Sequence, residues 1–499
     1  MWASPHSYKD DEKYLSPFYG IRCAVNVPNK HRLRAGWLLS IRHHLKRRRF
    51  TLPPNTSALF MLTGGFASLI TLGTLLLLMP LSTVSDEAAS FRLAIFTATS
   101  AACVTGLVLV NTGTYWSGFG QFIIASLMFL GGIGIMTAGG LLLIIIGKRL
   151  TLADRLTLRE PIGAPNLGQV SRLVWQIVLF AFAIQIIGSI LFSLNFQANY
   201  SVGQATWHAI FHSVSAFNNA GFSIIPNSSS LASMSSNFLF LSATGVLIIL
   251  GGISFAVIID LSHRKRPNRW SLDTKLVLLG SLILWMFGAV TFFLLERSNL
   301  NTIGSLPIGS QILTSLFQSV SGRTAGFSTI DFGLASEMTR GIYMLLMFIG
   351  GTSASTAGGI KIGTFMILVI VIWSSMKGRE HPEAFRRELP TAQVARAVTI
   401  IVLATGIILI LIVSLSFTEA SNLDSQQFKL SDVLFELISA FSTNGLSSGV
   451  SPSMTPSGQY VLIIAMYLGR VGPLALALGL ALGQRKAIYR YTQETIRIG

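Results

Sequence analysis

Long apolar runs alternate with polar linkers along most of the chain. A helix needs about 20 apolar residues to cross the hydrocarbon core of a membrane, and eight segments have roughly that length or more. The pattern therefore predicts an all-α membrane protein with eight transmembrane helices. The predicted spans cover residues 58–81, 118–147, 172–195, 237–261, 274–295, 341–375, 394–417 and 459–483.

The linkers after the first, third, fifth and seventh spans share a second pattern. Each holds a moderately apolar, helix-like stretch of about a dozen residues, followed by a polar turn with a glycine before Leu or Phe. The turn glycines are separated by 115, 105 and 119 residues, which indicates an internal repeat. The four segments read "FRLAIFTATSAACVTGLVLVNTG", "ATWHAIFHSVSAFNNAGFSIIPN", "QILTSLFQSVSGRTAGFSTIDFG" and "LSDVLFELISAFSTNGLSSGVSP".

These short segments predict re-entrant loops, because a dozen residues cannot cross the membrane as a helix. A short helix would enter from outside and an extended strand would return. The expected architecture is four parallel span–pore-loop–span repeats around a central pore, with eight transmembrane helices and four re-entrant pore helices. The expected units are a basic cytoplasmic tail over 1–55 and repeats over 56–150, 151–270, 271–385 and 386–499.

Composition and charge fit this topology. The chain is 51% hydrophobic and 11% charged, and its net charge of +17 comes from Lys and Arg clustered beside the spans. The basic linkers follow the even-numbered spans, whereas the other linkers are poor in Lys and Arg and carry acids such as Glu296. Both termini are expected in the cytoplasm, and the basic charge indicates orientation rather than nucleic-acid binding. Cys23 and Cys103 do not form a disulfide framework.

The four glycine turns are the candidate selectivity filter. Rings of backbone carbonyls can replace the water shell of an ion, and glycine leaves room for them. The pore helices would also direct their partly negative C-terminal ends at the centre, which favours a cation. Ordinary turns between membrane helices are the alternative for any single site. The candidate residues are Val104, Thr105 and Gly106; Asn219, Ala220 and Gly221; Thr324, Ala325 and Gly326; and Thr443, Asn444 and Gly445.

The sixth span contains a polar interruption, "GGTSASTAGG", where its helix should break. We expect a loop in the pore just below the filter; a close-packed contact of small residues is the alternative. Arg470 is a lone arginine within the eighth span and costs at least ~2.5 kcal/mol there, so it should face an interior cavity. Lys361 is either a second pore charge or a gate anchor. The candidate gate comprises Gly350, Gly351, Thr352, Ser353, Ala354, Ser355, Thr356, Ala357, Gly358, Gly359, Lys361 and Arg470.

The motifs "CVTGL", "NNAGF", "GRTAGF" and "STNGL", one per repeat, give a specific resemblance over residues 55–499. The chain resembles the Trk/Ktr/HKT superfamily of potassium transporters, and within it the ion-translocating subunit of Ktr-type systems. The resemblance implies potassium uptake across the cytoplasmic membrane of a bacterium through a selective pore. It also implies a flexible gate in the interrupted span and a pore-facing arginine at Arg470. Sodium-permeable members carry serine in place of Gly106, so this glycine favours potassium.

The same resemblance implies partners. They are a second copy in a homodimer and a cytoplasmic ring of nucleotide-binding regulatory subunits, through which ATP or ADP would act. Potassium is the substrate, sodium activates uptake in several relatives, and no covalent chemistry is expected.

The sequence leaves three other interpretations open. A sodium-preferring cation transporter of the same superfamily is the first, and a non-transporting membrane scaffold or intramembrane enzyme is the second. A metal site at His208 and His212 is the third. These two residues are four apart, like the histidines of some metal sites, but helix packing is the default interpretation for them.

Overall fold

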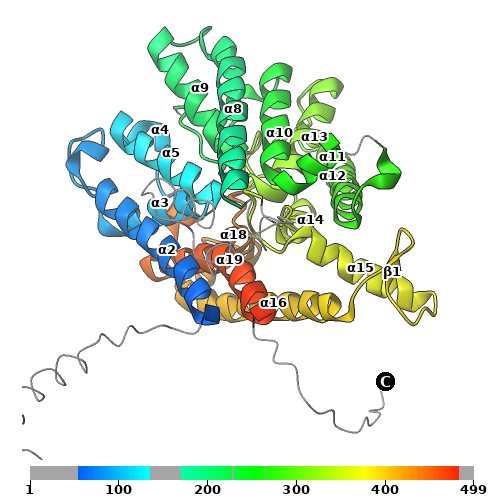
Figure 1. Ribbon diagram of the computed structural model, residues 1–499. Coiled ribbons are helices and arrows are strands. Elements are labelled where there is room, and N and C mark those ends of the chain that lie inside the picture. The colour runs from blue at the N-terminus through cyan, green and yellow to red at the C-terminus, as the bar shows by residue number, and fades with distance from the viewer. Residues whose placement is uncertain (1–53, 135–169, 227–229, 264–265, 354, 483–499) are drawn as a thin grey trace, which may run out of the picture. The chain divides into compact units, whose positions relative to one another are not determined.

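The computed structural model describes residues 54–134, 170–226, 230–263, 266–353 and 355–482 (Figure 1). The chain divides into two units, Met1–Leu52 and Pro53–Gly499, and every described residue belongs to the second. Most of the predicted basic tail, Cys23 and the candidate gate residue Ala354 therefore lie outside the described residues.

The described part is almost entirely helical, as the apolar pattern predicts. Its only strands form one hairpin, in which β1 (Glu383–Ala384) pairs antiparallel with β2 (Arg387–Glu388). The short helices that precede the glycine turns are α3 (Phe91–Ala102), α9 (Val202–Phe217), α13 (Ile308–Thr324) and α18 (Leu430–Ser442). The other helices are α2 (Pro54–Leu77), α4 (Thr112–Tyr115), α5 (Gly118–Ile133), α8 (Val170–Phe196), α10 (Phe238–Gly252), α11 (Phe255–His263), α12 (Leu272–Glu296), α14 (Glu337–Phe348), α15 (Ile362–Met376), α16 (Thr391–Thr418), α17 (Ala420–Asp424) and α19 (Pro456–Leu482).

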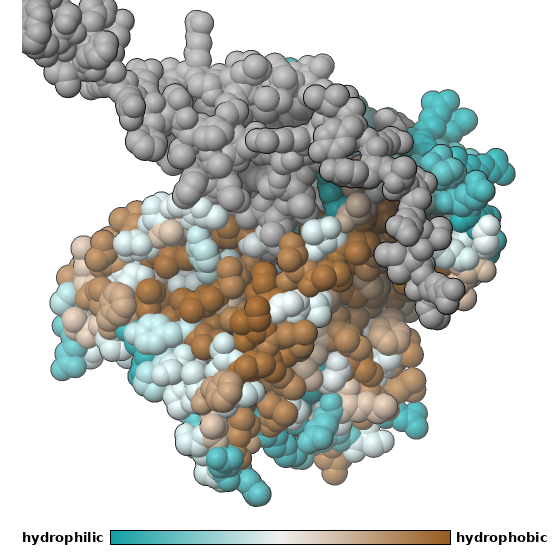
Figure 2. Space-filling view, turned by 90° about the horizontal axis from the view of Figure 1, so that it is seen from below, coloured by the Kyte–Doolittle hydropathy of each residue, from teal (hydrophilic) through white to brown (hydrophobic). Residues whose placement is uncertain are grey.

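Several of these helices are suited to a membrane. Among the described residues, Val174–Phe196, Leu272–Glu296 and Thr391–Thr418 are long and apolar enough to span one. The helices α10 and α11 form a fourth apolar stretch that bends by 97°. Large apolar side chains such as Leu179, which is 71% exposed, face outward, and Figure 2 shows apolar residues over much of one face. A multi-pass membrane protein explains these exposed surfaces, whereas eight complete spans remain a prediction.

The four helices that precede the glycine turns pack against flanking helices in a recurring order. Each contacts one helix earlier and one later in the chain: α3 lies against α2 and α5, α9 against α8 and α10, α13 against α12 and α14, and α18 against α16 and α19. Further contacts join these groups in sequence, through α5 with α9, α10 with α13, α14 with α18, and finally α19 with α3. The last contact closes the order on itself, so the described helices surround a common centre.

Buried carboxylates connect the helices at their ends. Glu296 accepts hydrogen bonds from the Ser336 N–H (2.9 Å) and the Thr339 hydroxyl (2.5 Å) in the first turn of α14. Glu419 likewise accepts hydrogen bonds from the N–H (3.0 Å) and the hydroxyl (2.6 Å) of Thr455, which lies just before α19. Both glutamates are fully buried. Glu296 is thus a structural cap, because helix N-termini have unpaired N–H groups that a carboxylate satisfies.

Replacing Glu419 with alanine should destabilise the protein, because the Thr455 N–H would lose its acceptor and the Thr455 hydroxyl would keep only the Thr418 carbonyl at 3.3 Å. Hydrogen bonds to charged groups contribute about 1.5–3 kcal/mol, so the free energy of unfolding should fall by about 2–4 kcal/mol. Thermal unfolding of the detergent-solubilised protein measures this change. Glu419→Gln keeps one acceptor and should have a milder effect; unchanged stability in Glu419→Ala would contradict the capping role.

Candidate functional site

Each of the four short helices ends two to four residues before its turn glycine, and the sequence predicts this order of helix and turn. The helices α3, α9, α13 and α18 end at Ala102, Phe217, Thr324 and Ser442. The four turn glycines all have positive φ, at 92° for Gly106, 70° for Gly221, 73° for Gly326 and 95° for Gly445. Side chains other than glycine rarely adopt this backbone conformation, which accounts for glycine at all four positions.

The four turns contact one another in a closed ring. A Cβ placed on Gly106 would collide with the carbonyl oxygen of Ala220, and one on Gly221 would collide with that of Ala325. A Cβ on Gly326 would collide with the carbonyl oxygen of Asn444, and one on Gly445 would collide with that of Thr105. Each glycine therefore faces the carbonyl oxygen of the next turn in chain order, and the fourth faces the first. These contacts bring together eight of the twelve residues predicted for the filter, namely the four glycines with Thr105, Ala220, Ala325 and Asn444.

A serine in each short helix supports its turn, and sequence reasoning missed it. The hydroxyls of Ser100 and Ser439 accept hydrogen bonds from the N–H groups of Gly106 (3.1 Å) and Gly445 (3.0 Å). The hydroxyls of Ser215 and Ser321 instead donate to the carbonyl of the residue after the turn glycine, at 2.8 and 2.6 Å. The signal was available, because all four segments carry serine five or six residues before the glycine.

The third turn differs from the others because it is one residue shorter. Six residues separate the supporting serine from the glycine in the first, second and fourth turns, but five separate Ser321 from Gly326. The three longer turns accommodate the extra residue by placing one residue in the left-handed backbone conformation. Its φ is 58° at Val104, 58° at Asn219 and 47° at Thr443. Thr324 needs no such conformation. Left-handed backbone at residues other than glycine carries strain, which the surrounding contacts must hold.

Polar side chains also brace the extended segments that follow the second and fourth turns. The His212 Nδ1 donates to the His208 carbonyl (2.8 Å), which leaves Nε2 to accept from the Ser223 hydroxyl (3.1 Å). In the fourth segment the buried Glu436 occupies the position that matches His212 and accepts from the Ser448 N–H at 2.9 Å. His212 thus contacts Ser223 in the segment after its turn, as well as aromatic side chains of α8 and α10.

The sixth span breaks where its glycines and hydroxyl residues predict. The helix α14 ends at Phe348 and α15 begins at Ile362, and the 350–361 loop joins them. Two hydrogen bonds close the base of this loop: the Gly350 N–H donates to the Ile360 carbonyl (2.8 Å) and the Ile362 N–H to the Gly351 carbonyl (3.0 Å). The loop is therefore a defined structure and not a helix–helix contact of small residues.

The 350–361 loop lies against three of the four turns. Asn219 of the second turn donates to the Thr356 hydroxyl at 2.8 Å. Arg323, directly before the third turn, donates to the Gly350 carbonyl at 3.3 Å. Gly358 lies so close to Thr443 of the fourth turn that a Cβ would collide with its hydroxyl.

Arg470 and Lys361 both hold this loop. The guanidinium of Arg470 donates to the Thr356 carbonyl (2.6 Å) and to the Gly131 carbonyl (2.5 Å) at the end of α5. The Lys361 ammonium donates to the Ala357 carbonyl at 2.6 Å, so the contact that the structure gives it is that of an anchor within the loop. Ser353 is the exposed residue of the described loop.

The comparisons with known proteins point to one family. The family model described as "Cation transport protein" (TrkH) matches residues 29–488. The chain is 37% identical to the "Ktr system potassium uptake protein B" of Bacillus subtilis, over 90% of this chain and 97% of that protein. It is 35% identical to the "Potassium/sodium uptake protein NtpJ" of Enterococcus hirae, over 88% of this chain and 96% of that protein.

A solved structure has the same fold. The potassium transporter TrkH from Vibrio parahaemolyticus matches with a TM-score of 0.65, covering 86% of each chain at 19% identity. Because the family model covers most of the chain and the relatives align over nearly their full lengths, the chain belongs to the TrkH family of cation transport proteins.

Proposed function

We propose that this chain is the membrane subunit of a Ktr-type system for potassium uptake. The main observation that supports this function is the ring of carbonyl oxygens at the four glycine turns. The relatives named as potassium uptake proteins support the choice of ion, and the family is one of transporters rather than enzymes.

Potassium would be selected at the ring and would pass down its electrochemical gradient without covalent chemistry. An ion entering the ring exchanges water for the carbonyl oxygens of Thr105, Ala220, Ala325 and Asn444. The four short helices end at the ring, so their partly negative C-termini add to the attraction for a cation. A glycine at each contact keeps side chains out of the ion's path.

The 350–361 loop and Arg470 would limit the flow as a gate. The loop lies against the turns, and Arg470 holds it to the end of α5 through two carbonyls. The partly buried positive charge of Arg470 beside the path also opposes the passage of a cation. Displacing the loop and the guanidinium together would open the path.

The finer architecture is part of the same proposal. We assign four parallel span–pore-loop–span repeats, over 56–150, 151–270, 271–385 and 386–499, around a central pore with eight transmembrane helices. The closed order of helix contacts supports this assignment. The protein would lie in the cytoplasmic membrane of a bacterium with both termini inside, as the basic linkers favour.

The chain would work as a homodimer with a cytoplasmic, nucleotide-binding regulatory subunit. The name of the Bacillus subtilis relative as part of a "Ktr system" supports a multicomponent assembly. ATP or ADP would act through that subunit.

Sodium has two conceivable roles. It would activate potassium uptake, or it would itself be carried, as the name of the Enterococcus hirae relative allows. Gly106 in the first turn weighs against a sodium-preferring protein. Competition between the two ions distinguishes these roles.

Gly326→Ser should lower the apparent affinity for potassium by about tenfold or more, because its Cβ would collide with the Asn444 carbonyl. The measurement is rubidium uptake, with potassium and sodium as competitors, in potassium-uptake-deficient bacteria that also express a Ktr-type regulatory subunit. Gly341→Ser in α14 is the matched control, since a Cβ there meets nothing within 4 Å. Equal affinities in the two variants would mean that the turns do not contact the ion.

Ser439→Ala should raise the apparent KM for potassium several-fold, because the buried Gly445 N–H loses its acceptor at a cost of about 1–3 kcal/mol. The same uptake measurement applies. Ser414→Ala removes an exposed hydroxyl of α16 that bonds only within its own helix, and its KM should match the wild type. A wild-type KM in Ser439→Ala would exclude a supporting role for this hydroxyl.

Arg470→Gln should raise the maximal rate of uptake by roughly twofold or more, because the loop loses charged hydrogen bonds and the path loses a positive charge. Initial rates at saturating potassium measure this change. The control is Arg379→Gln, since the exposed Arg379 pairs with Glu383 beyond the end of α15. A rate that falls in Arg470→Gln while the amount of folded protein is unchanged would refute the gate.

A further inference from the structure

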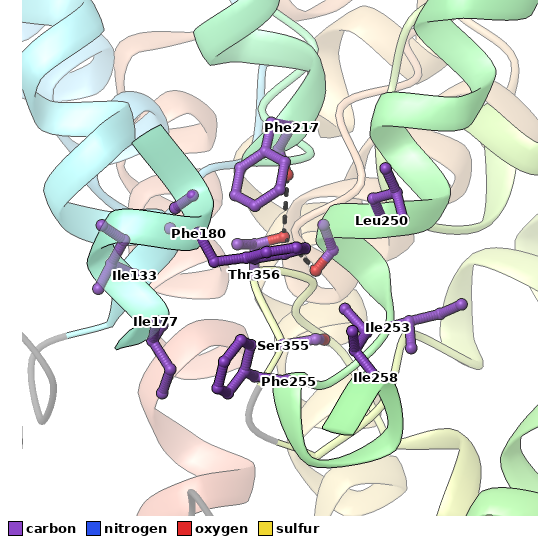
Figure 3. Close-up of a pocket in the computed structure, with 13 residues that line it drawn as sticks. Ile133, Ile177, Phe180, Phe217, Leu250, Ile253, Phe255, Ile258, Ser355 and Thr356 are labelled. Carbon is purple, nitrogen blue, oxygen red and sulfur yellow. Dashed lines mark hydrogen bonds between the residues drawn. The ribbon is translucent and has the colours of Figure 1, made fainter. Parts of the chain in front are cut away.

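Thr356 belongs to the loop between α14 and α15, but its hydroxyl is bonded to the second turn. It accepts from the Asn219 Nδ2 at 2.8 Å and donates to the Gly251 carbonyl at 2.8 Å, with the Phe217 carbonyl at 3.3 Å. Figure 3 shows Thr356 below Phe217 with these hydrogen bonds to carbonyl oxygens. The hydroxyl is thus used both as donor and as acceptor, which only Ser or Thr could provide at this position.

The Asn219 carboxamide extends this connection to the third turn. Its Oδ1 accepts from the Thr324 hydroxyl at 3.0 Å, while its Nδ2 donates to Thr356. Asn219 is fully buried and has φ of 58°, a conformation that its surroundings must hold. If the Thr356 hydroxyl were lost, the remaining acceptor near Nδ2 would be the Phe217 carbonyl at 3.3 Å. The carboxamide would then be held only by that carbonyl and by the Thr324 hydroxyl, and the position it gives to both turns would be less firmly fixed.

The backbone of Thr356 is held as well. Its carbonyl accepts from Arg470, and its N–H donates to the Gly251 carbonyl at 3.2 Å. A loop that moves away from the ring must therefore pull the Thr356 hydroxyl away from Asn219. The connection is specific to the second and third turns, because the matching residues Val104 and Thr443 have no hydrogen bond to Thr356 among those that the structure describes.

We propose that Thr356 is a positioning residue for ion selectivity. Its hydroxyl holds the Asn219 carboxamide, and the carboxamide in turn holds the second and third turns. Thr356 does not contact the ion. Displacing the loop would consequently relax the ring as well as open the path, so that selectivity and gating depend on one hydrogen bond. This inference rests on the proposed function of the ring as a filter.

The test is Thr356→Val, which keeps the shape of the side chain and removes the hydroxyl. Apparent affinities for potassium and sodium are measured by competition against rubidium uptake in cells that contain a Ktr-type regulatory subunit. The ratio of the two affinities should fall by about tenfold. Thr356→Ser keeps the hydroxyl and should retain the wild-type ratio. Ser414→Ala removes an exposed hydroxyl of α16, outside the ring and the loop, and should also retain it.

A second variant covers the case in which valine prevents folding, since its extra methyl would face the Asn219 amide. Thr356→Ala avoids that contact and should show the same fall in the ratio, with size-exclusion profiles of the detergent-extracted protein reporting folding. An increased maximal rate with an unchanged affinity ratio would overturn the proposal, because the hydroxyl would then only hold the loop. Absence of potassium uptake in the wild type would instead overturn the proposed function itself.

Discussion

The close approach of four backbone turns is the constraint on which the rest of this structure depends. At each contact a glycine meets the carbonyl oxygen of the neighbouring turn, and no Cβ fits between them. Backbone turns that approach this closely have no room for side chains between them, so their support comes from the surrounding elements. The supporting serines, the polar braces and the 350–361 loop all act on this ring.

Burying so many polar groups requires that nearly every one has a partner. In a membrane the cost of leaving one unpaired is high, and this explains why hydroxyls and carboxylates in the structure bond to backbone groups. Glu296 and Glu419 cap helices, and Glu436 braces the extended segment after the fourth turn. Arg470 binds the Thr356 carbonyl in the loop and the Gly131 carbonyl in the last turn of α5. The irregular segments are stable because these side chains replace the hydrogen bonds that helices make internally.

The prediction from sequence succeeded where one local property decided the outcome. Apolar length predicted the long helices, and glycine with hydroxyl residues predicted the break in the sixth span, which falls between Phe348 and Ile362. The fourfold spacing predicted turns after short helices, and all four helices end beside their glycines. Prediction was less complete at Glu296, for which charge patterning indicated only a linker position and which the structure buries, and at the supporting serines, whose recurrence the prediction did not use.

The sequence by itself determined which residues form the four turns, since glycine spacing and apolar length are local properties of the chain. Only the tertiary structure decided that these turns meet in chain order and that the loop lies against three of them. Asn219 and Thr356 are 137 residues apart, and a hydrogen bond between them depends on how separate helices pack. The sequence alone does not say which donor or acceptor lies near a given hydroxyl. Packing of the helices brings one partner within hydrogen-bonding distance and leaves the others too far away.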